Sequence, residues 1–301
     1  MRSLPGLALF LCTGVAIASD TPQQLADQAL QQTSKVCQNV QSSLQCHTTY
    51  LAGCSKSATA EYDPYLDYLK NQLTPPTSEA TETLDPQMLQ KLEGETPPLL
   101  VPNNHRDFSP QFVKLNEGEI VQATGYLYYA VQTSAESCNC ERAGPKDSDY
   151  HIGLGFDASL VAEAKTKPAA TSSEFHDLQS NSMIVEITPY YRAKNEPGWT
   201  LAKLKALYGA QVKVVGQLLA DNDHYLAAQD CGMKGAVASS CWRLSIWEIH
   251  PVTAFYVCNT NADCAKTDTG WTALEAWSPT KSGKHATGET NDAGGKHSSP
   301  Q

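Results

Sequence analysis

Arginine is scarce in this sequence, and long apolar runs are missing from all but its first residues. Residues 108–258 contain three arginines, Arg142, Arg192 and Arg243. No later stretch is apolar for about 18 residues, the length that suggests a membrane-spanning helix. The chain also lacks a Gly-Xaa-Ser-Xaa-Gly elbow, a Walker loop and a His-Glu-Xaa-Xaa-His helix. These absences argue against a transmembrane protein and against serine hydrolases, nucleotide-binding proteins and metalloproteases of the usual kinds.

Positive charge is also in deficit. The chain has 22 Lys and Arg against 32 Asp and Glu, a formal charge of −10, and residues 108–258 have 12 against 16, a balance of −4. Proteins that bind nucleic acids need a basic surface to attract phosphates. Tyr126 and Tyr128 could stack on bases, although packing against a covering segment explains them more simply. The charge therefore predicts that nucleic acid is not the partner.

The first 18 residues have the features of a secretory signal peptide. Met1 and Arg2 precede an apolar run over residues 7–17, and small residues end at Ala18 before Ser19. Cleavage is expected between Ala18 and Ser19. The run is too short to remain as a membrane-spanning helix. We therefore expect a secreted or periplasmic protein.

Ten cysteines, nine of them beyond the predicted cleavage site, are typical of a protein from an oxidising compartment. Proximity in the sequence suggests two disulfides, Cys231 with Cys241 and Cys258 with Cys264. The pairing of the other five mature cysteines stays open, and the odd number leaves at least one thiol free or bonded to another chain. These five are Cys37, Cys46, Cys54, Cys138 and Cys140.

Composition divides the mature chain into four parts. Residues 19–73 have helical composition and contain three cysteines; one or two helices are expected between Gln23 and Gly53, and a further short helix from Pro64 to Leu73. Residues 74–110 are rich in Pro, Thr and Glu, which predicts a linker or an irregular wrapping segment. Residues 111–277 form the predicted globular domain. Residues 278–301 are almost free of apolar side chains and predict a disordered tail.

The globular domain has the element order of an OB-fold barrel. Period-two alternation predicts strands at residues 120–132, 150–156 and 183–188. A helix is expected from Trp199 to Tyr208, and two more strands at residues 212–219 and 244–257. Three strands, a helix and two strands form the five-stranded Greek-key barrel called the OB fold. The first strand is expected to point Tyr129 and Val131 into the barrel and Tyr126 and Tyr128 out of it.

Several short motifs resemble a group of exported bacterial proteins with OB-fold-like domains, for which no activity is established. The resemblance covers residues 115–257. It implies the fold and export, and transfers no chemistry. The motifs that carry it are Glu136-Ser137-Cys138-Asn139-Cys140, Asp149-Tyr150-His151-Ile152, Glu186-Ile187-Thr188-Pro189, Gly216 with Asp221 and His224, and Trp247-Glu248-Ile249-His250-Pro251-Val252.

Histidines and carboxylates in these motifs form the candidate site. In an OB barrel the third strand lies between the second and the fifth, so His151, Glu186 and the pair Glu248 and His250 are expected on adjacent strands, facing outward. Zinc or another divalent metal could be bound by His151, His224, His250 and Glu186, with Glu186 or Glu248 as a base. The simpler interpretation is that these are ordinary strand-face residues, hydrogen-bonded to one another beneath a cover.

We therefore expect an exported binding module without a cofactor, whose ligand is an oligosaccharide, a peptide or an envelope protein. A metal-dependent hydrolase and a structural component of the cell envelope are the alternatives. Convergence of the metal ligands on one point would favour the hydrolase. Burial of the same face beneath residues 74–110 would favour the structural role. The expected ligand surface comprises Tyr126, Tyr128, His151, Glu186, His224, Glu248 and His250.

Overall fold

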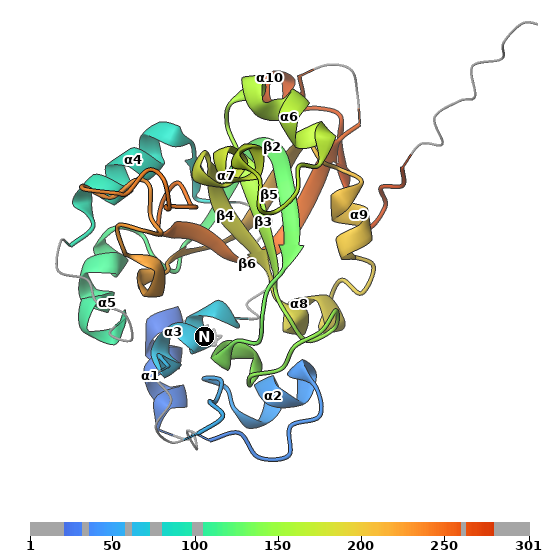
Figure 1. Cartoon of the computed structure of the whole chain (residues 1–301). Helices are drawn as coiled ribbons and strands as arrows, with labels where there is room; N and C mark the ends of the chain where they lie inside the picture. Colours follow the sequence, from blue (N-terminus) through green and yellow to red (C-terminus); the bar gives the residue numbers. More distant parts are fainter. Residues whose placement is uncertain are drawn as a thin grey trace, which may run out of the picture.

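The computed structural model describes residues 21–31, 36–57, 62–72, 80–97, 105–259 and 263–279 (Figure 1). The predicted signal peptide, its cleavage site and the predicted tail from residue 280 onward lie outside the described residues. Within the described ranges, no helix has both the length and the apolar character needed to cross a membrane.

Five strands close into a mixed barrel, as predicted from their order. They are β2 (Ile120–Gln132), β3 (Tyr150–Gly155), β4 (Ser182–Ile187), β5 (Gln211–Ala220) and β6 (Trp247–Cys258). The order around the barrel is β2-β3-β4-β6-β5, and β5 pairs again with β2. All these pairs are antiparallel except β4 with β6. This is the topology of an OB-fold-like barrel. Two short strands extend it, β1 (Glu82–Leu84) beside β2 and β7 (Trp271–Ala273) beside β6.

A bulge in β2 changes which side chains enter the barrel. Leu127 pairs with Leu154, but Tyr129 already pairs with Gly153, so Tyr128 is the extra residue. A bulge shifts the alternation by one position. Ala130 therefore enters the core, while Tyr129 joins an outer cluster. The prediction that Tyr129 and Val131 point inward is wrong, because period-two counting assumed an unbroken strand.

The outer tyrosines are covered by two helices between β3 and β4, α6 (Val161–Thr166) and α7 (Ser173–Ser180), which appear in front of the sheet in Figure 1. Tyr128 and Tyr129 pack there with Phe175 and Leu178. Tyr128 is buried and its hydroxyl donates to the carbonyl of Asp157. Tyr128 thus packs under a cover, as the simpler interpretation of the two tyrosines predicted. Tyr126 is half-buried at the same cluster.

Two helices connect β4 to β5. The predicted helix over residues 199–208 is present as the shorter α9 (Leu201–Lys205), and Trp199, Leu204 and Leu207 around it join the barrel core. A preceding helix, α8 (Pro189–Lys194), was not predicted. Thr188 caps α8 and Pro189 occupies its first turn. Proline is favoured at that position because the N–H it lacks has no partner there.

The N-terminal segment folds against the barrel. It contains α1 (Pro22–Leu30), α2 (Ser43–Thr49) and α3 (Pro64–Lys70), and the last of these confirms the helix predicted at Pro64. Leu66 and Leu69 of α3 pack against Leu219 of β5. Disulfides join Cys37 to Cys54 within the segment and Cys46 to Cys140 across to the barrel domain. The segment is therefore attached to the barrel by both an apolar contact and a covalent bond.

Residues 74–110 were expected to form a linker or an irregular wrapping segment, but residues 80–97 and 105–110 have regular secondary structure. They contain β1, α4 (Pro86–Glu95) and the first turns of α5 (His105–Lys114). Asp85 caps α4 and Pro86 begins it, so the proline starts a helix instead of breaking one. Leu89 and Leu92 of α4 belong to the barrel core. This part of the chain is structurally part of the globular domain.

The two disulfides predicted from sequence proximity are present, Cys231 with Cys241 and Cys258 with Cys264. The second closes the loop before the short helix α10 (Cys264–Thr267). Among the described cysteines, Cys138 is free and buried. The odd thiol expected from the count of nine is therefore an internal one.

Candidate functional site

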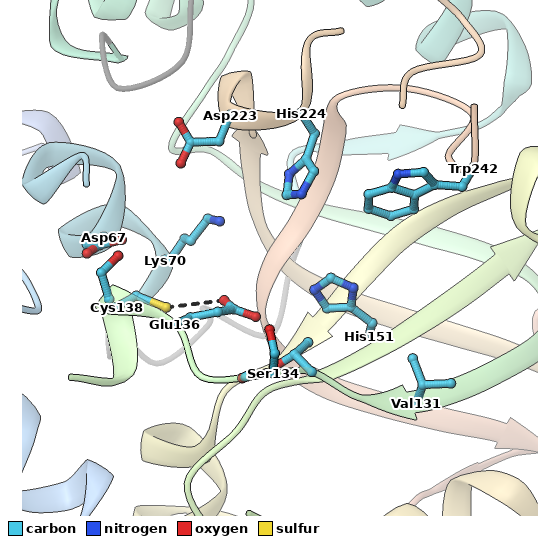
Figure 2. Close-up of a pocket in the computed structure, with 12 residues that line it drawn as sticks. Asp67, Lys70, Val131, Ser134, Glu136, Cys138, His151, Asp223, His224 and Trp242 are labelled. Atoms are coloured by element: carbon cyan, nitrogen blue, oxygen red, sulfur yellow. Dashed lines mark hydrogen bonds between the residues drawn. The ribbon is translucent and has the colours of Figure 1, made fainter. Parts of the chain in front are cut away.

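A polar cavity of about 430 Å³ lies between the barrel and its N-terminal cover (Figure 2). Helix α3, the segment after β2, strand β3 and the β5–β6 connection each contribute to its wall. Figure 2 shows Lys70 and Asp67 entering from α3, while His151, His224 and Trp242 come from the barrel side. The lining residues are Asp67, Lys70, Val131, Thr133, Ser134, Glu136, Ser137, Cys138, His151, Asp223, His224 and Trp242.

His151 connects the cavity to the buried barrel surface. Cross-strand pairing sets His151 of β3 opposite Glu186 of β4, and their Nε2 and Oε1 atoms lie 2.6 Å apart. His151 keeps 17% of its side chain exposed, whereas Glu186 keeps 1%. Burial lowers the pKa of His151, and the carboxylates of Glu136 and Glu248 offset this only in part. A neutral imidazole here can both donate and accept hydrogen bonds.

His224 forms a second histidine–carboxylate pair in the same cavity. It lies on η3 (Asn222–His224), a short 3-10 helix that follows β5. Its Nδ1 atom is 2.7 Å from Oδ2 of Asp221, a buried residue at the end of β5. The ring of Trp242 lies beside both histidines (Figure 2). It is edge-to-face with His224 at 5.1 Å and nearly parallel to His151 at 6.5 Å, both between centroids.

Buried cations fix the carboxylates behind the cavity. Lys70 Nζ and Arg243 Nη1 each lie 3.3 Å from Oδ2 of Asp221. Arg243 also donates through Nη2 to Glu248. Burial would raise the pKa of Asp221, but His224, Lys70 and Arg243 together hold it well below its usual range. Asp221 is therefore an ionised anchor for groups from α3, η3 and the connection before β6.

Glu248 and His250 lie on the outer face of β6, as the alternation predicted, but they are fully buried and not exposed. His250 Nδ1 is 3.0 Å from Oε1 of Glu248. Arg243 pairs with Glu248 from outside the barrel, with Lys70 of α3 beside it on Asp221. The N-terminal segment and the β5–β6 connection cover this part of the barrel, so the simpler interpretation, hydrogen-bonded strand-face residues beneath a cover, is confirmed for Glu248 and His250.

Asp149 is a buried site residue that sequence reasoning did not select. It precedes β3, two positions before His151, and Asn139 Nδ2 donates to its Oδ2 at 2.5 Å. Burial and the charge of Glu136 raise the pKa of Asp149 to about 6. The period of two that placed His151 outward also applies to Asp149. That signal was present in the sequence, whereas the roles of Lys70 and Trp242 depend on tertiary packing.

The predicted metal ligands do not converge as a set. Within the described ranges, three groups have ligand atoms within 4.8 Å of one another. None contains His151 or His224. Glu186 and His250 do share a group, with Asp149 as the third member. The three groups are Cys37 with Cys54 and Cys140, Glu136 with Cys138 and Asp149, and Asp149 with Glu186 and His250.

By structure, the protein is an OB-fold-like domain with a covered polar site on the outer surface of its barrel. No protein-family model matches the chain, and searches of curated proteins and of solved structures find no match either. Its function must therefore be argued from the cavity itself.

Proposed function

We propose that the protein is an exported binding module that takes a sugar unit of an oligosaccharide into the cavity beside Trp242. The observation that carries this proposal is the Trp242 ring in the cavity wall beside two histidine–carboxylate pairs. An aromatic face packs well against the apolar face of a sugar ring. The histidines, Lys70 and Glu136 supply donors and acceptors for hydroxyl groups around it.

The size and charge of the cavity support a small polar ligand. Its volume of about 430 Å³ is in the range of small-molecule sites, roughly 300–1,000 Å³. Its wall mixes acidic and basic side chains, so neither a phosphate backbone nor a strongly charged ligand is favoured. Four disulfides agree with an oxidising compartment. The signal-peptide features and the resemblance to exported OB-fold-like proteins support the same location.

A glycan-binding screen followed by titration tests the proposal. The wild-type protein should bind a defined oligosaccharide, and Trp242→Ala should weaken that binding at least tenfold. The matched control is Trp271→Ala, since Trp271 is a partly exposed tryptophan on β7 that does not line the cavity. Equal binding by both variants, or no binding of any glycan by the wild type, would reject the proposal.

Hydrolysis of the bound ligand is a second candidate function, favoured by one observation. Two histidines, each paired with a buried carboxylate, open into the same cavity. Such pairs can act as a general base and a general acid. Under this alternative, His151→Gln and His224→Gln would each abolish release of reducing sugar from the bound oligosaccharide while binding persists. Binding without any turnover by the wild type would leave only the binding role.

A further inference from the structure

Three buried side chains from different strands meet beneath the cavity. Glu186 of β4 and His250 of β6 are brought together because Val185 pairs with Ile249 in the parallel part of the barrel. Asp149 approaches from the start of β3. The exposed fractions of Asp149, Glu186 and His250 are 0%, 1% and 0%. One ligand atom from each of the three lies within 4.8 Å of the other two.

Each of these side chains has one polar atom engaged by a neighbour and one without a hydrogen-bond partner. Oδ2 of Asp149 accepts from Asn139, Oε1 of Glu186 lies 2.6 Å from Nε2 of His151, and Nδ1 of His250 lies 3.0 Å from Glu248. The buried atoms left without a hydrogen bond are Asp149 Oδ1, Glu186 Oε2 and His250 Nε2. The ion-pair neighbour of Glu186 Oε2 is His250 Nδ1, at 3.7 Å.

Metal ligands in proteins show the same arrangement, in which one polar atom is held by a neighbouring residue and the other is left to bind the metal. A ligating histidine usually donates its second ring N–H to a carboxylate, and ligating carboxylates are themselves hydrogen-bonded. Glu248 forms a buried ion pair with Arg243. An ionised carboxylate can only accept, so Nδ1 of His250 is the donor. Nε2 is then the ring nitrogen of His250 without a hydrogen-bond partner, and it would supply the lone pair to a metal ion.

Charge at the cluster also calls for a cation. Buried carboxylates are costly unless they are paired, and the ion-pair neighbours of Glu186 are the imidazoles of His151 and His250. The nearby cations are engaged elsewhere: Lys70 with Asp221, and Arg243 with Asp221 and Glu248. Within the described ranges, no lysine or arginine is in ion-pair contact with Asp149 or Glu186. A divalent ion bound by this group would neutralise both carboxylates.

We propose that Asp149, Glu186 and His250 form a binding site for a divalent transition metal such as zinc or manganese. One imidazole nitrogen with two carboxylates suits these ions better than calcium or magnesium, which favour oxygen ligands alone. Asp149 also groups with Glu136 and Cys138, both of which line the cavity. This inference does not depend on the proposed sugar ligand.

Metal binding by the purified full chain tests the proposal. After removal of metals with a chelator, titration with zinc or manganese ions alone should show one tight equivalent per chain. Asp149→Asn and His250→Gln should each weaken it at least tenfold. The matched control is His224→Gln, because His224 lines the same cavity but lies outside the three-residue group. It should bind the ion like the wild type.

A second measurement separates lost binding from lost folding. A bound ion stabilises the folded state, so zinc should raise the melting temperature of the wild type and of His224→Gln. Asp149→Asn preserves the shape of the side chain; it should melt cooperatively, but its melting temperature should not respond to zinc. Equal binding by all variants would identify an adventitious ion only. That result, or no bound metal in a folded wild type, would overturn the proposal.

Discussion

Cys46 and Cys140 are joined by a disulfide that spans 94 residues of sequence. Cys46 lies on α2 of the N-terminal segment, and Cys140 directly follows η1 (Ser137–Asn139), which contributes to the cavity wall. The bond thus fixes the N-terminal segment at the edge of the site to which α3 contributes Lys70 and Asp67. The segment completes the site and is not an attachment to a finished domain.

We expect removal of this disulfide to destabilise the protein strongly. A disulfide that closes a loop of this length restricts the unfolded chain. From the chain-entropy relation, the double variant Cys46→Ala with Cys140→Ala should lose about 4–5 kcal/mol of unfolding free energy. The matched control removes Cys258 and Cys264, which are separated by 6 residues; the same relation gives about 2 kcal/mol. Urea unfolding of both double variants measures the difference. Equal losses would mean that loop length does not set the contribution.

The barrel could be predicted because strand alternation is a local signal. All five strands were placed within about three residues of their observed ends, since their core-facing residues recur every second position. The bulge at Tyr128 and the helix starting at Pro86 were missed. Both are exceptions to a local rule. An extra residue in a strand shifts the alternation of side chains, and a proline, which breaks the interior of a helix, is accepted in its first turn.

The site was only half predictable. His151, Glu186, Glu248 and His250 were selected because alternation places them on one outer surface of the barrel. The groups that bury and fix them are distant in sequence: Lys70 meets Asp221 across 151 residues. Such contacts leave no local pattern. The composition of the His/Glu face was therefore predictable, whereas the residues that cover it were not.

We expect the thiol of Cys138 to be unreactive in the folded protein. It is buried, and burial together with the charges of Glu136 and Asp149 raises its pKa well above the usual value. The thiolate is the reactive form, so alkylation should be slow at neutral pH. Comparison of wild type with Cys138→Ser by a colorimetric thiol assay checks this. The two should not differ when folded and should differ by one thiol in denaturant; a rapid native reaction that Cys138→Ser removes would contradict the prediction.

Replacing Arg243 should be among the most destabilising changes in the protein. Its guanidinium is fully buried and pairs with both Asp221 and Glu248. Arg243→Met would leave these two carboxylates short of a counter-charge, at a cost of about 3–5 kcal/mol. Arg106→Met is the control, because Arg106 pairs with Asp27 at the exposed surface and such pairs contribute at most about 1 kcal/mol. Similar unfolding free energies for the two variants would refute the assigned role of Arg243.

Asp230 should make the protein less stable as the pH rises. Burial and the neighbouring Glu93 raise its pKa from 3.8 to about 8. Between these values the unfolded chain releases the proton that the folded chain keeps, so the unfolding free energy falls through this range and stays lower above about pH 8. Each pKa unit corresponds to about 1.4 kcal/mol, so the fall amounts to several kcal/mol.

The Asp230→Asn variant isolates this effect, since the amide resembles the protonated acid at every pH. Its stability advantage over the wild type should grow from pH 5 to pH 8 in urea unfolding. Glu93→Gln provides the comparison, because it removes the like charge but keeps Asp230 buried. The fall in unfolding free energy with pH should be smaller in Glu93→Gln but still present, because burial is the larger cause of the raised pKa of Asp230. A constant difference between Asp230→Asn and wild type across this range would show that Asp230 is ionised in both states.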